Sequence, residues 1–239
     1  MCEAAQHNVV VVGAGGFGRE VVQYVRDTLP VQRYTLAGFL DDSPDPQRLE
    51  VLGLPYLGRL DGFRPTEDDR VVMAIGEPRV RLQAARVMAT RGARFLTLIH
   101  PKAYVASSAL IGEGCIVAPF ACVGAGAVLG EQVQLHYCAS AAHDTVIGDG
   151  SALSPYAAVN GGAVLEACVF LGTHATVNPL KRVGAYARVS AGSVVYRDVP
   201  SGALVFGNPA KPRALRFGGA IGGAESEGGE GSPGPASTL

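Results

Sequence analysis

A six-residue repeat in the second half of this 239-residue chain constrains its fold most strongly. From residue 99 to residue 195 an aliphatic side chain recurs at every sixth position without insertion. Ile, Leu or Val occupies sixteen of these seventeen positions, and Ala141 is the exception. The aliphatic positions are Ile99, Val105, Ile111, Val117, Val123, Leu129, Leu135, Ile147, Leu153, Val159, Leu165, Leu171, Val177, Val183, Val189 and Val195. Separate β-strands would drift in spacing, so this constant phase is typical of a coiled solenoid.

The other positions of each hexad predict the shape of one coil. The fifth position is almost always small, as at Ala121 and Ala157, which indicates a narrow interior. The second position is often Gly or Asn, as at Gly124, and we expect it to adopt the unusual backbone dihedrals of a tight corner. Three hexads close one triangular coil, so the repeat predicts a left-handed parallel β-helix. Lys181 occupies a fifth position and predicts a bulge over residues 179–182.

Residues 8–95 show a different pattern, in which strands alternate with helices. This alternation predicts a small Rossmann-like parallel sheet. The expected strands are 8–12, 36–40, 70–75 and 95–99, and the expected helices are 19–29 and 78–91. Pro101 is expected to give the β-helix an irregular start. The predicted domains are 1–98 (Rossmann-like), 99–216 (β-helix) and a disordered tail, 217–239, rich in Gly, Ser, Glu and Pro.

The first predicted strand runs into a glycine-rich turn with the spacing Gly13-x-Gly15-x-x-Gly18. The backbone amides of such a turn and the helix N-terminus behind it can bind a pyrophosphate. NAD, another nucleotide diphosphate and a turn without ligand all remain open on this pattern. Asp41 or Asp42, after the second strand, could accept hydrogen bonds from a base or ribose.

Composition argues against several functional classes. The net charge is −1, with 20 basic and 21 acidic residues, so neither nucleic acid nor an anionic membrane is an expected partner. The five cysteines show no zinc-type spacing, and no metal is expected. Residues 114–130 carry no charge, but the hexad repeat explains them better than a membrane span. The first residues lack the pattern of a signal peptide, so a cytoplasmic protein with reduced thiols is expected.

His143 and Asp144 are the strongest candidates for chemistry. A carboxylate beside an imidazole can orient the ring, fix its tautomer and stabilise the imidazolium. Ala141, the exception in the repeat, lies two residues before His143, and function is expected where a local rule is broken. His100 is expected to be a packing or hydrogen-bonding residue at the hinge between the domains.

Five segments together resemble the bacterial nucleotide-sugar acetyltransferases of the sialic-acid O-acetyltransferase-like family. They are GAGGFGREV at 13–21, FLDD at 39–42, AIG at 74–76, HD-x-x-IG at 143–148 and GNPAK at 207–211. The resemblance covers about residues 8–215. It implies a Rossmann-like nucleotide-sugar domain followed by a left-handed β-helix. It also implies acetyl-CoA as cosubstrate and a homotrimer with active sites between neighbouring subunits.

The resemblance also assigns roles to individual residues. It makes His143 the general base and Asp144 its orienting acid. His136 stands where the family commonly carries Asn, which puts the acceptor specificity in question. The implied substrate-binding residues are Gly13, Gly15, Phe17, Gly18, Asp41, Asp42, Gly76 and His136, and the implied acetyl-CoA-binding residues are Gly161, Lys181, Asn208, Pro209 and Lys211.

The expected reaction is acetyl transfer from acetyl-CoA to the amine of a nucleotide-linked sugar. Two alternatives remain open from the sequence: O-acetylation of a sugar hydroxyl by the same base, and a non-catalytic trimer that only binds a sugar nucleotide. The sequence does not identify the nucleotide, the sugar or the acylated position.

Overall fold

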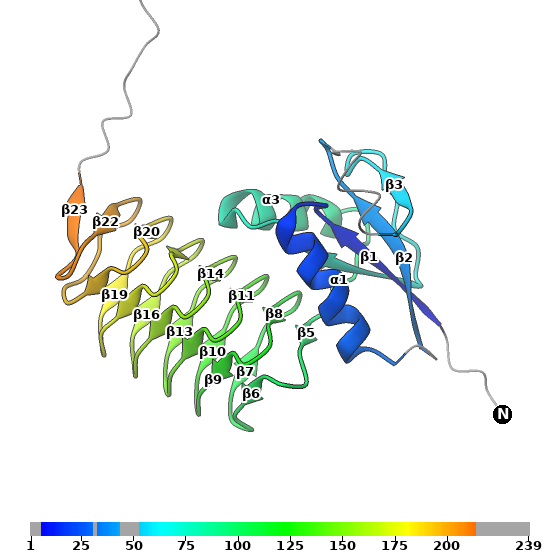
Figure 1. The fold of residues 1–239 in the computed structure, drawn as a ribbon. Helices are drawn as coiled ribbons and strands as arrows, with labels where there is room; N and C mark the ends of the chain where they lie inside the picture. The colour runs from blue at the N-terminus through cyan, green and yellow to red at the C-terminus, as the bar shows by residue number, and fades with distance from the viewer. Residues whose placement is uncertain (1–5, 31–32, 44–52, 214–239) are drawn as a thin grey trace, which may run out of the picture.

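The structure is a computed structural model that describes residues 6–30, 33–43 and 53–213. A small N-terminal unit of helices and strands lies against one end of a long stack of coils (Figure 1). The predicted tail at 217–239 lies outside the described residues. The predicted domain limits at 98 and 216 remain predictions.

The N-terminal unit is a four-stranded parallel sheet with a helix on each face. Alternate valines of the central strand point to opposite faces: Val9 and Val11 pack with one helix, Val10 and Val12 with the other. The strand order is β3-β2-β1-β4. The elements are β1 His7–Val12, α1 Gly16–Thr28, β2 Tyr34–Leu40, β3 Tyr56–Gly58, β4 Asp69–Met73 and α3 Pro78–Ala89.

The predicted elements are found with shifted ends. Helix α1 begins at Gly16, three residues earlier than expected, because the glycine-rich turn itself forms its first turn. Strand β3 was not predicted. The expected strand 95–99 is divided between the two units: Phe95 bridges Val71 in the first sheet, whereas β5 (Leu98–Ile99) pairs with the β-helix.

The second unit is a parallel β-helix of two-residue strands that recur every six residues. Each strand pairs with the strand three hexads away, as Ala141 does with Val123 and Val159, so the predicted parallel coil is confirmed. Its left-handed sense remains a prediction. The strands after β5 are β6 Tyr104–Val105, β7 Leu110–Ile111, β8 Ile116–Val117, β9 Cys122–Val123, β10 Val128–Leu129, β11 Gln134–Leu135, β12 Ser140–Ala141, β13 Val146–Ile147, β14 Ala152–Leu153, β15 Ala158–Val159, β16 Val164–Leu165, β17 Phe170–Leu171, β18 Thr176–Val177, β19 Arg182–Val183, β20 Arg188–Val189 and β21 Val194–Val195, followed by β22 Leu204–Phe206 and β23 Lys211–Arg213.

The strands form three sheets around an apolar interior. One, which we call the covered sheet, contains β5, β8, β11, β14, β17, β20 and the antiparallel hairpin β22–β23. The N-terminal unit packs on it, so outward residues such as Ile116 and Gln134 are buried. The second sheet contains β6, β9, β12, β15, β18 and β21, and the third contains β7, β10, β13, β16 and β19.

The expected bulge at residues 179–182 is wrong. Arg182 pairs with Val164 and Val183 with Leu165 in unbroken register. The Lys181 carbonyl accepts the ordinary coil-to-coil hydrogen bond from the Val164 amide at 2.9 Å. The Lys181 side chain is partly exposed, so its flexible stem leaves the narrow interior without displacing the backbone.

The expected reason for the second-position glycines is also wrong. Left-handed dihedrals occur at the fourth position of the hexads, where non-glycine residues such as Tyr156 (φ 62°) adopt them. At the second position, glycine is required because a side chain would collide with the backbone of the next coil. A Cβ on Gly124 would lie 2.6 Å from the backbone nitrogen of His143 in the next coil, and one on Gly148 would lie 2.6 Å from the Glu166 carbonyl carbon.

The β-helix begins regularly, so the irregular start expected at Pro101 is wrong. The amides of Leu98 and His100 already donate to the next coil at 2.8 and 2.9 Å. His100 is buried; its Nδ1 accepts a hydrogen bond from the Lys102 amide and its Nε2 lies 3.4 Å from Asp27 Oδ2. These contacts confirm its packing and hydrogen-bonding role.

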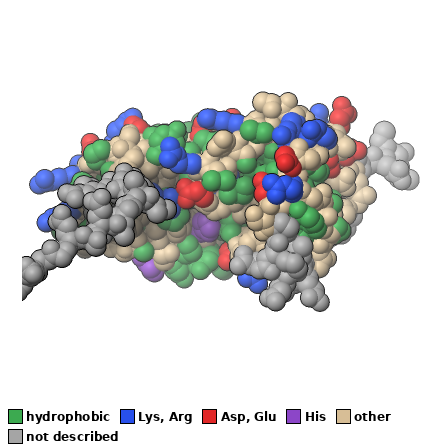
Figure 2. Space-filling model, turned by 90° about the horizontal axis from the view of Figure 1, so that it is seen from above, with side chains coloured by type: hydrophobic (Ala, Val, Ile, Leu, Met, Phe, Trp, Pro, Cys, Tyr) green, Lys and Arg blue, Asp and Glu red, His purple; other side chains and the backbone are tan. Residues whose placement is uncertain are grey.

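The surface carries charges of both signs. On the face in Figure 2, Lys and Arg side chains lie scattered among Asp and Glu, with apolar side chains between them. None of the helices in the described part of the chain is long and apolar enough to cross a bilayer.

Candidate functional site

The glycine-rich turn leaves open space above the N-terminus of α1. Gly13 has a left-handed φ of +104°, and a Cβ there would lie 3.0 Å from the Ala74 carbonyl oxygen. A Cβ on Gly18 would overlap the Gly13 carbonyl oxygen, so the turn itself requires both glycines. Gly15 differs, because a Cβ on it would meet nothing within 4 Å. The turn therefore leaves room at Gly15 for a ligand group beside the helix N-terminus.

Asp41 and Asp42 hold the neighbouring loops together. Asp41 Oδ2 accepts a hydrogen bond from the Ala14 amide at 2.7 Å, and its Oδ1 accepts one from the Ser43 amide at 2.8 Å. Asp42 Oδ1 accepts from the Leu60 amide at 2.9 Å. Asp41 thus stabilises the glycine-rich turn and Asp42 the loop after β3, and contact of either with a base or ribose remains a prediction.

Gly76 follows β4 at the same edge of the sheet. A Cβ on Gly76 would meet nothing within 4 Å, as at Gly15. The carboxyl ends of β1 and β4 meet where Gly13 approaches Ala74. An opening at the carboxyl edge of a parallel sheet is the usual place for a nucleotide in such folds.

His136 joins this opening to the β-helix. It lies on the corner after β11, and its ring centroid lies 4.4 Å from that of Phe17, in the first turn of α1. Burial, followed by the positive charge of Arg81, lowers the pKa of His136 to about 4. The imidazole is therefore neutral near pH 7 and can either donate or accept a hydrogen bond.

His143 and Asp144 lie on the corner after β12. Asp144 adopts a left-handed φ of 58°, a conformation that Asp tolerates better than most residues. Its Oδ2 lies 2.9 Å from Nδ1 of His143. Because a carboxylate only accepts, it selects the tautomer of the neutral ring in which Nδ1 carries the hydrogen and Nε2 keeps its lone pair. The side chains are 70% and 72% exposed, so an incoming molecule can reach Nε2.

Gly161 lies beside the His143 ring in the next coil. A Cβ on Gly161 would overlap Nε2 of His143. The Gly162 amide donates to the His143 carbonyl at 3.0 Å, whereas the Gly161 amide donates to no acceptor among the described residues. The His143 ring thus lies beside Gly161, a residue whose N–H has no acceptor among the described residues, and acyl transfer to a nucleophile uses both a base and such a donor.

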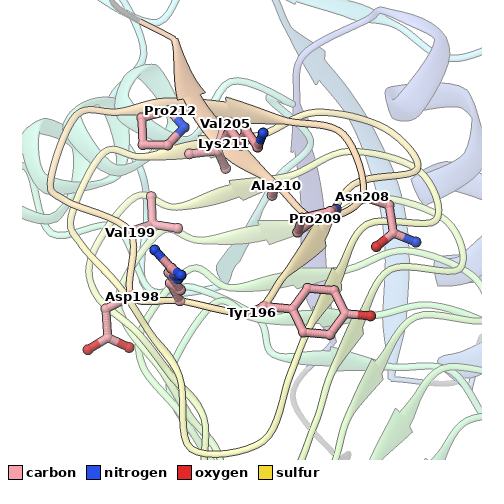
Figure 3. A pocket seen from close by; sticks show the side chains of 10 residues that line it. Tyr196, Asp198, Val199, Val205, Asn208, Pro209, Ala210, Lys211 and Pro212 are labelled. Atoms are coloured by element: carbon pink, nitrogen blue, oxygen red, sulfur yellow. The ribbon is translucent and has the colours of Figure 1, made fainter.

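A cavity of about 670 Å³ lies at the far end of the β-helix, between β21 and the β22–β23 hairpin. Figure 3 shows the lining side chains, which come from residues 196–199 after β21 and from the β22–β23 hairpin with its turn. The predicted residues Asn208, Pro209 and Lys211 line it, together with Tyr196 and Arg197, which were not predicted. The predicted Lys181 is not among the lining residues.

The two histidines of the candidate site lie on different corners of one coil. His136 precedes β12 (Ser140–Ala141) and His143 follows it. The glycine-rich turn approaches the His136 corner through Phe17. A single chain therefore brings the glycine-rich turn to one end of β12 and the His143–Asp144 pair to the other.

The remaining histidine of the β-helix stacks on an aromatic side chain. His174 lies parallel to Tyr156, with ring centroids 4.8 Å apart, and Tyr137 meets Tyr156 edge-on. Within residues 6–30, 33–43 and 53–213 there is no group of three or more His, Cys, Asp or Glu residues that could hold a metal ion.

Sequence reasoning missed Arg81, which connects the two units. Its buried guanidinium donates to carbonyl oxygens of both the loop after β4 and the β-helix. The sequence did contain a signal: on α3, Arg81 shares the buried face with Leu82, Ala85 and Met88. A charged residue on the apolar face of a helix indicates a buried polar partner.

Comparison with known proteins supports the same organisation. Residues 8–88 match the family described as the PglD N-terminal domain. The chain is 35% identical over 115 residues to the UDP-N-acetylbacillosamine N-acetyltransferase of Bacillus subtilis (strain 168). This match covers 46% of the chain and 50% of that protein, so the chain spans about half the length of this curated relative.

Solved structures match over most of the chain. The acetyltransferase domain of PglB from Neisseria gonorrhoeae FA1090 is 32% identical, with a TM-score of 0.78, over 87% of this chain and 100% of that domain. The same domain has been solved in complex with acetyl coenzyme A, with a TM-score of 0.77. PerB from Caulobacter crescentus, in complex with CoA and GDP-perosamine, is 32% identical, with a TM-score of 0.79, over 88% of this chain and 99% of that one.

Proposed function

Because the chain belongs to the family of hexapeptide-repeat acetyltransferases of nucleotide-linked amino sugars, we propose that it transfers an acetyl group from acetyl-CoA to the amine of such a sugar. The observation that carries this proposal is the His143–Asp144 pair, in which Nε2 of His143 lies beside Gly161. The relatives solved with acetyl coenzyme A, or with CoA and GDP-perosamine, support the choice of both substrates.

In the proposed reaction, His143 Nε2 takes the proton from the sugar amine as the amine nitrogen attacks the thioester carbon. Asp144 keeps the ring in the required tautomer and stabilises the imidazolium. The Gly161 amide donates to the oxyanion of the tetrahedral intermediate. As the C–S bond breaks, His143 returns the proton to the departing thiolate, which leaves an amide and free CoA. General-base catalysis of this kind contributes about 10²- to 10⁴-fold in rate.

We place the acetyl donor along the corner that carries His143. Residues three hexads apart stack, so this corner runs from His143 through Gly161 and Pro179 to Arg197, which lines the far cavity. Three coil steps of about 4.8 Å span about 14 Å, a distance that a pantetheine arm can cover. Phosphate groups would then lie at the cavity near Arg197 and Lys211, with the thioester at His143.

We place the nucleotide of the acceptor at the opening over Gly13, Gly15, Gly18 and Gly76. Support comes from the open space at Gly15 and Gly76 and from the helix N-terminus below it. Phe17 and the neutral His136 would form the wall nearest the sugar. In this arrangement residues 1–98 bind the acceptor and residues 99–216 carry out the transfer.

A homotrimer with active sites between neighbouring subunits accounts best for the separation of the proposed acceptor opening and His143 on two corners of one coil. The acceptor opening lies at one end of β12 and His143 at the other, so a neighbouring chain can bring its His143 to this opening. A cytoplasmic location remains a prediction.

The test is a screen of UDP-, GDP- and dTDP-linked amino sugars with acetyl-CoA, following the free thiol released, beside the matching hydroxy sugars. N-acetylation predicts turnover with at least one amino sugar and none with its hydroxy counterpart. His143→Ala should abolish that turnover while keeping the oligomeric state. A folded His143→Ala protein with near-normal turnover would overturn the assignment, and calorimetry showing no acetyl-CoA binding would favour a scaffold.

A further inference from the structure

The loop after β4 is held to the β-helix by an ion pair on its exposed side. This loop, residues 74–77, contains Gly76 and ends at Glu77, which precedes α3. Nη1 of Arg188 donates to Oε1 and Oε2 of Glu77 at 3.0 and 2.9 Å. The same guanidinium lies 4.4 Å from the ring centroid of Phe170, which restricts its orientation. The covered sheet thus presents an ordered cation to the loop.

Arg81 fixes the same loop from its buried side. Its Nη1 donates to the carbonyl oxygens of Ile75 at 2.7 Å and Gly76 at 3.2 Å. Its Nε donates to the Gln132 carbonyl and its Nη2 to the Gly150 carbonyl, at 3.0 and 2.7 Å. Burial lowers the pKa of Arg81 to about 10, so the guanidinium remains charged at neutral pH. One side chain therefore joins the loop to two successive coils.

Two attachments of the loop, those made by Gln134 and Arg188, lie along one row of the covered sheet. Gln134, whose Nε2 donates to the Met73 carbonyl at 2.8 Å and to the Ile75 carbonyl at 3.4 Å, occupies the same position in its coil as Phe170 and Arg188 do in theirs. Gln134 and Arg188 are three coils apart, or about 14 Å. The attachments made by Gln134 and Arg188 therefore restrict the loop at two points along the covered sheet.

We infer that Arg188 and Glu77 are positioning residues that set where the acceptor sugar nucleotide lies relative to the β-helix. The inference rests on the proposed function, which places the nucleotide against Gly76. The two side chains are 43% and 42% exposed, and Arg81 holds the loop independently. Loss of the ion pair should therefore loosen the loop and leave the fold intact.

The test compares steady-state constants for the two substrates. Arg188→Met and Glu77→Gln should each raise KM for the amino-sugar nucleotide about threefold to tenfold, the effect expected of a partly exposed two-oxygen ion pair. KM for acetyl-CoA should stay within about twofold of the unaltered protein. The reversed pair, Arg188→Glu with Glu77→Arg, should recover most of the loss shown by Arg188→Glu alone.

Arg182→Met is the matched control. It removes an Arg–Glu pair of the same kind, in which Arg182 Nη2 lies 2.6 Å from Glu166 Oε1, on the third sheet. Each variant is first shown by size-exclusion chromatography to keep the oligomeric state of the unaltered protein. The control should leave KM for both substrates unchanged, and an equal rise in the control and in Arg188→Met would overturn the inference.

Hydrogen–deuterium exchange provides a readout that needs no turnover. Amides of residues 74–81 should exchange faster in Arg188→Met than in the Arg182→Met control. Unchanged exchange, or faster exchange with an unchanged KM for the sugar nucleotide, would overturn the inference. If no amino sugar is turned over, the proposed acetylation fails; calorimetric Kd values for UDP- and GDP-linked amino sugars then replace KM, and they must rise in Arg188→Met.

Discussion

Replacing Gly161 by Ala tests the proposed base directly, because it adds one methyl group beside the His143 ring. The added Cβ would overlap Nε2 and lie 2.5 Å from Cε1. Ordinary van der Waals contact begins near 3.4 Å, so the ring must move by about 1 Å. His143 is largely exposed and can turn outward, so the collision moves the base and leaves the coil in place.

The size of the effect follows from this displacement. A shift of about 1 Å in a reacting group can cost about 100-fold in rate. We therefore expect kcat to fall about 100-fold in Gly161→Ala. The melting temperature should hardly change, because Gly161 lacks a left-handed φ and Ala125 occupies the same corner position two coils earlier.

The assay is thiol release from acetyl-CoA with the best amino-sugar nucleotide, in a double-mutant cycle. Gly161→Ala, His143→Ala and the double variant are compared for kcat and for melting temperature. If the methyl group acts through the ring, it should cost little more once His143 has been removed. Near-normal kcat in folded Gly161→Ala would refute the reasoning, and so would full additivity of the two losses.

Gly15→Ala should weaken nucleotide-sugar binding about tenfold in calorimetry at an unchanged melting temperature, because its Cβ enters the open space in which we propose that the nucleotide binds. Gly18→Ala should lower the melting temperature instead, since its Cβ overlaps the Gly13 carbonyl; equal melting temperatures for these two variants would contradict both assignments. Because burial keeps His136 neutral in the fold down to about pH 4, whereas the unfolded chain takes up this proton near pH 6.5, the fold loses stability as the pH falls from about 6.5 toward about 4. By pH 4.5 the loss should reach about 2–3 kcal/mol in chemical denaturation and be absent in His136→Asn, so equal losses in both proteins would exclude this histidine as the cause. Lys211→Ala should raise KM for acetyl-CoA about tenfold and leave KM for the acceptor unchanged, whereas a rise for the acceptor alone would move the donor site elsewhere.

The β-helix could be predicted because its pairing is local and periodic. Each strand pairs with the strand three hexads away, so a constant six-residue phase determines the register of every coil. Even Ala141 keeps this register, because a small interior side chain leaves the coil-to-coil hydrogen bonds unchanged. The exception in the repeat therefore did not mark a distortion, although the proposed base lies two residues beyond it.

The corners were harder to predict, because two different constraints can select the same residue. Glycine at the second hexad position indicated unusual dihedrals, yet Gly124 is required by the close approach of the next coil. The left-handed conformation occurs two positions later, at residues as large as Tyr156. Only the stacking of successive coils distinguishes these constraints, and a single coil's sequence does not contain that information.

Parts of the site were predictable to the extent that they are local. His143 and Asp144 are neighbours in sequence, and their 2.9 Å contact needs only one corner. Phe17 and His136 are far apart in the chain, and their contact depends on how the N-terminal unit packs on the covered sheet. The bonds of Arg81 depend on the same packing.

A constant coil height sets the positions of the two proposed substrate sites along the β-helix. The proposed base, the free amide of Gly161 and the cavity at Arg197 lie on one corner because whole coils of three hexads separate them. The proposed acceptor site is not part of this repeat, because the loop after β4 that borders it belongs to the N-terminal unit. It needs separate attachments, which Arg81 supplies from α3 and Arg188 from the covered sheet. The β-helix therefore positions both proposed substrate sites. The geometry of transfer depends on the loop after β4 being held to the β-helix at more than one coil.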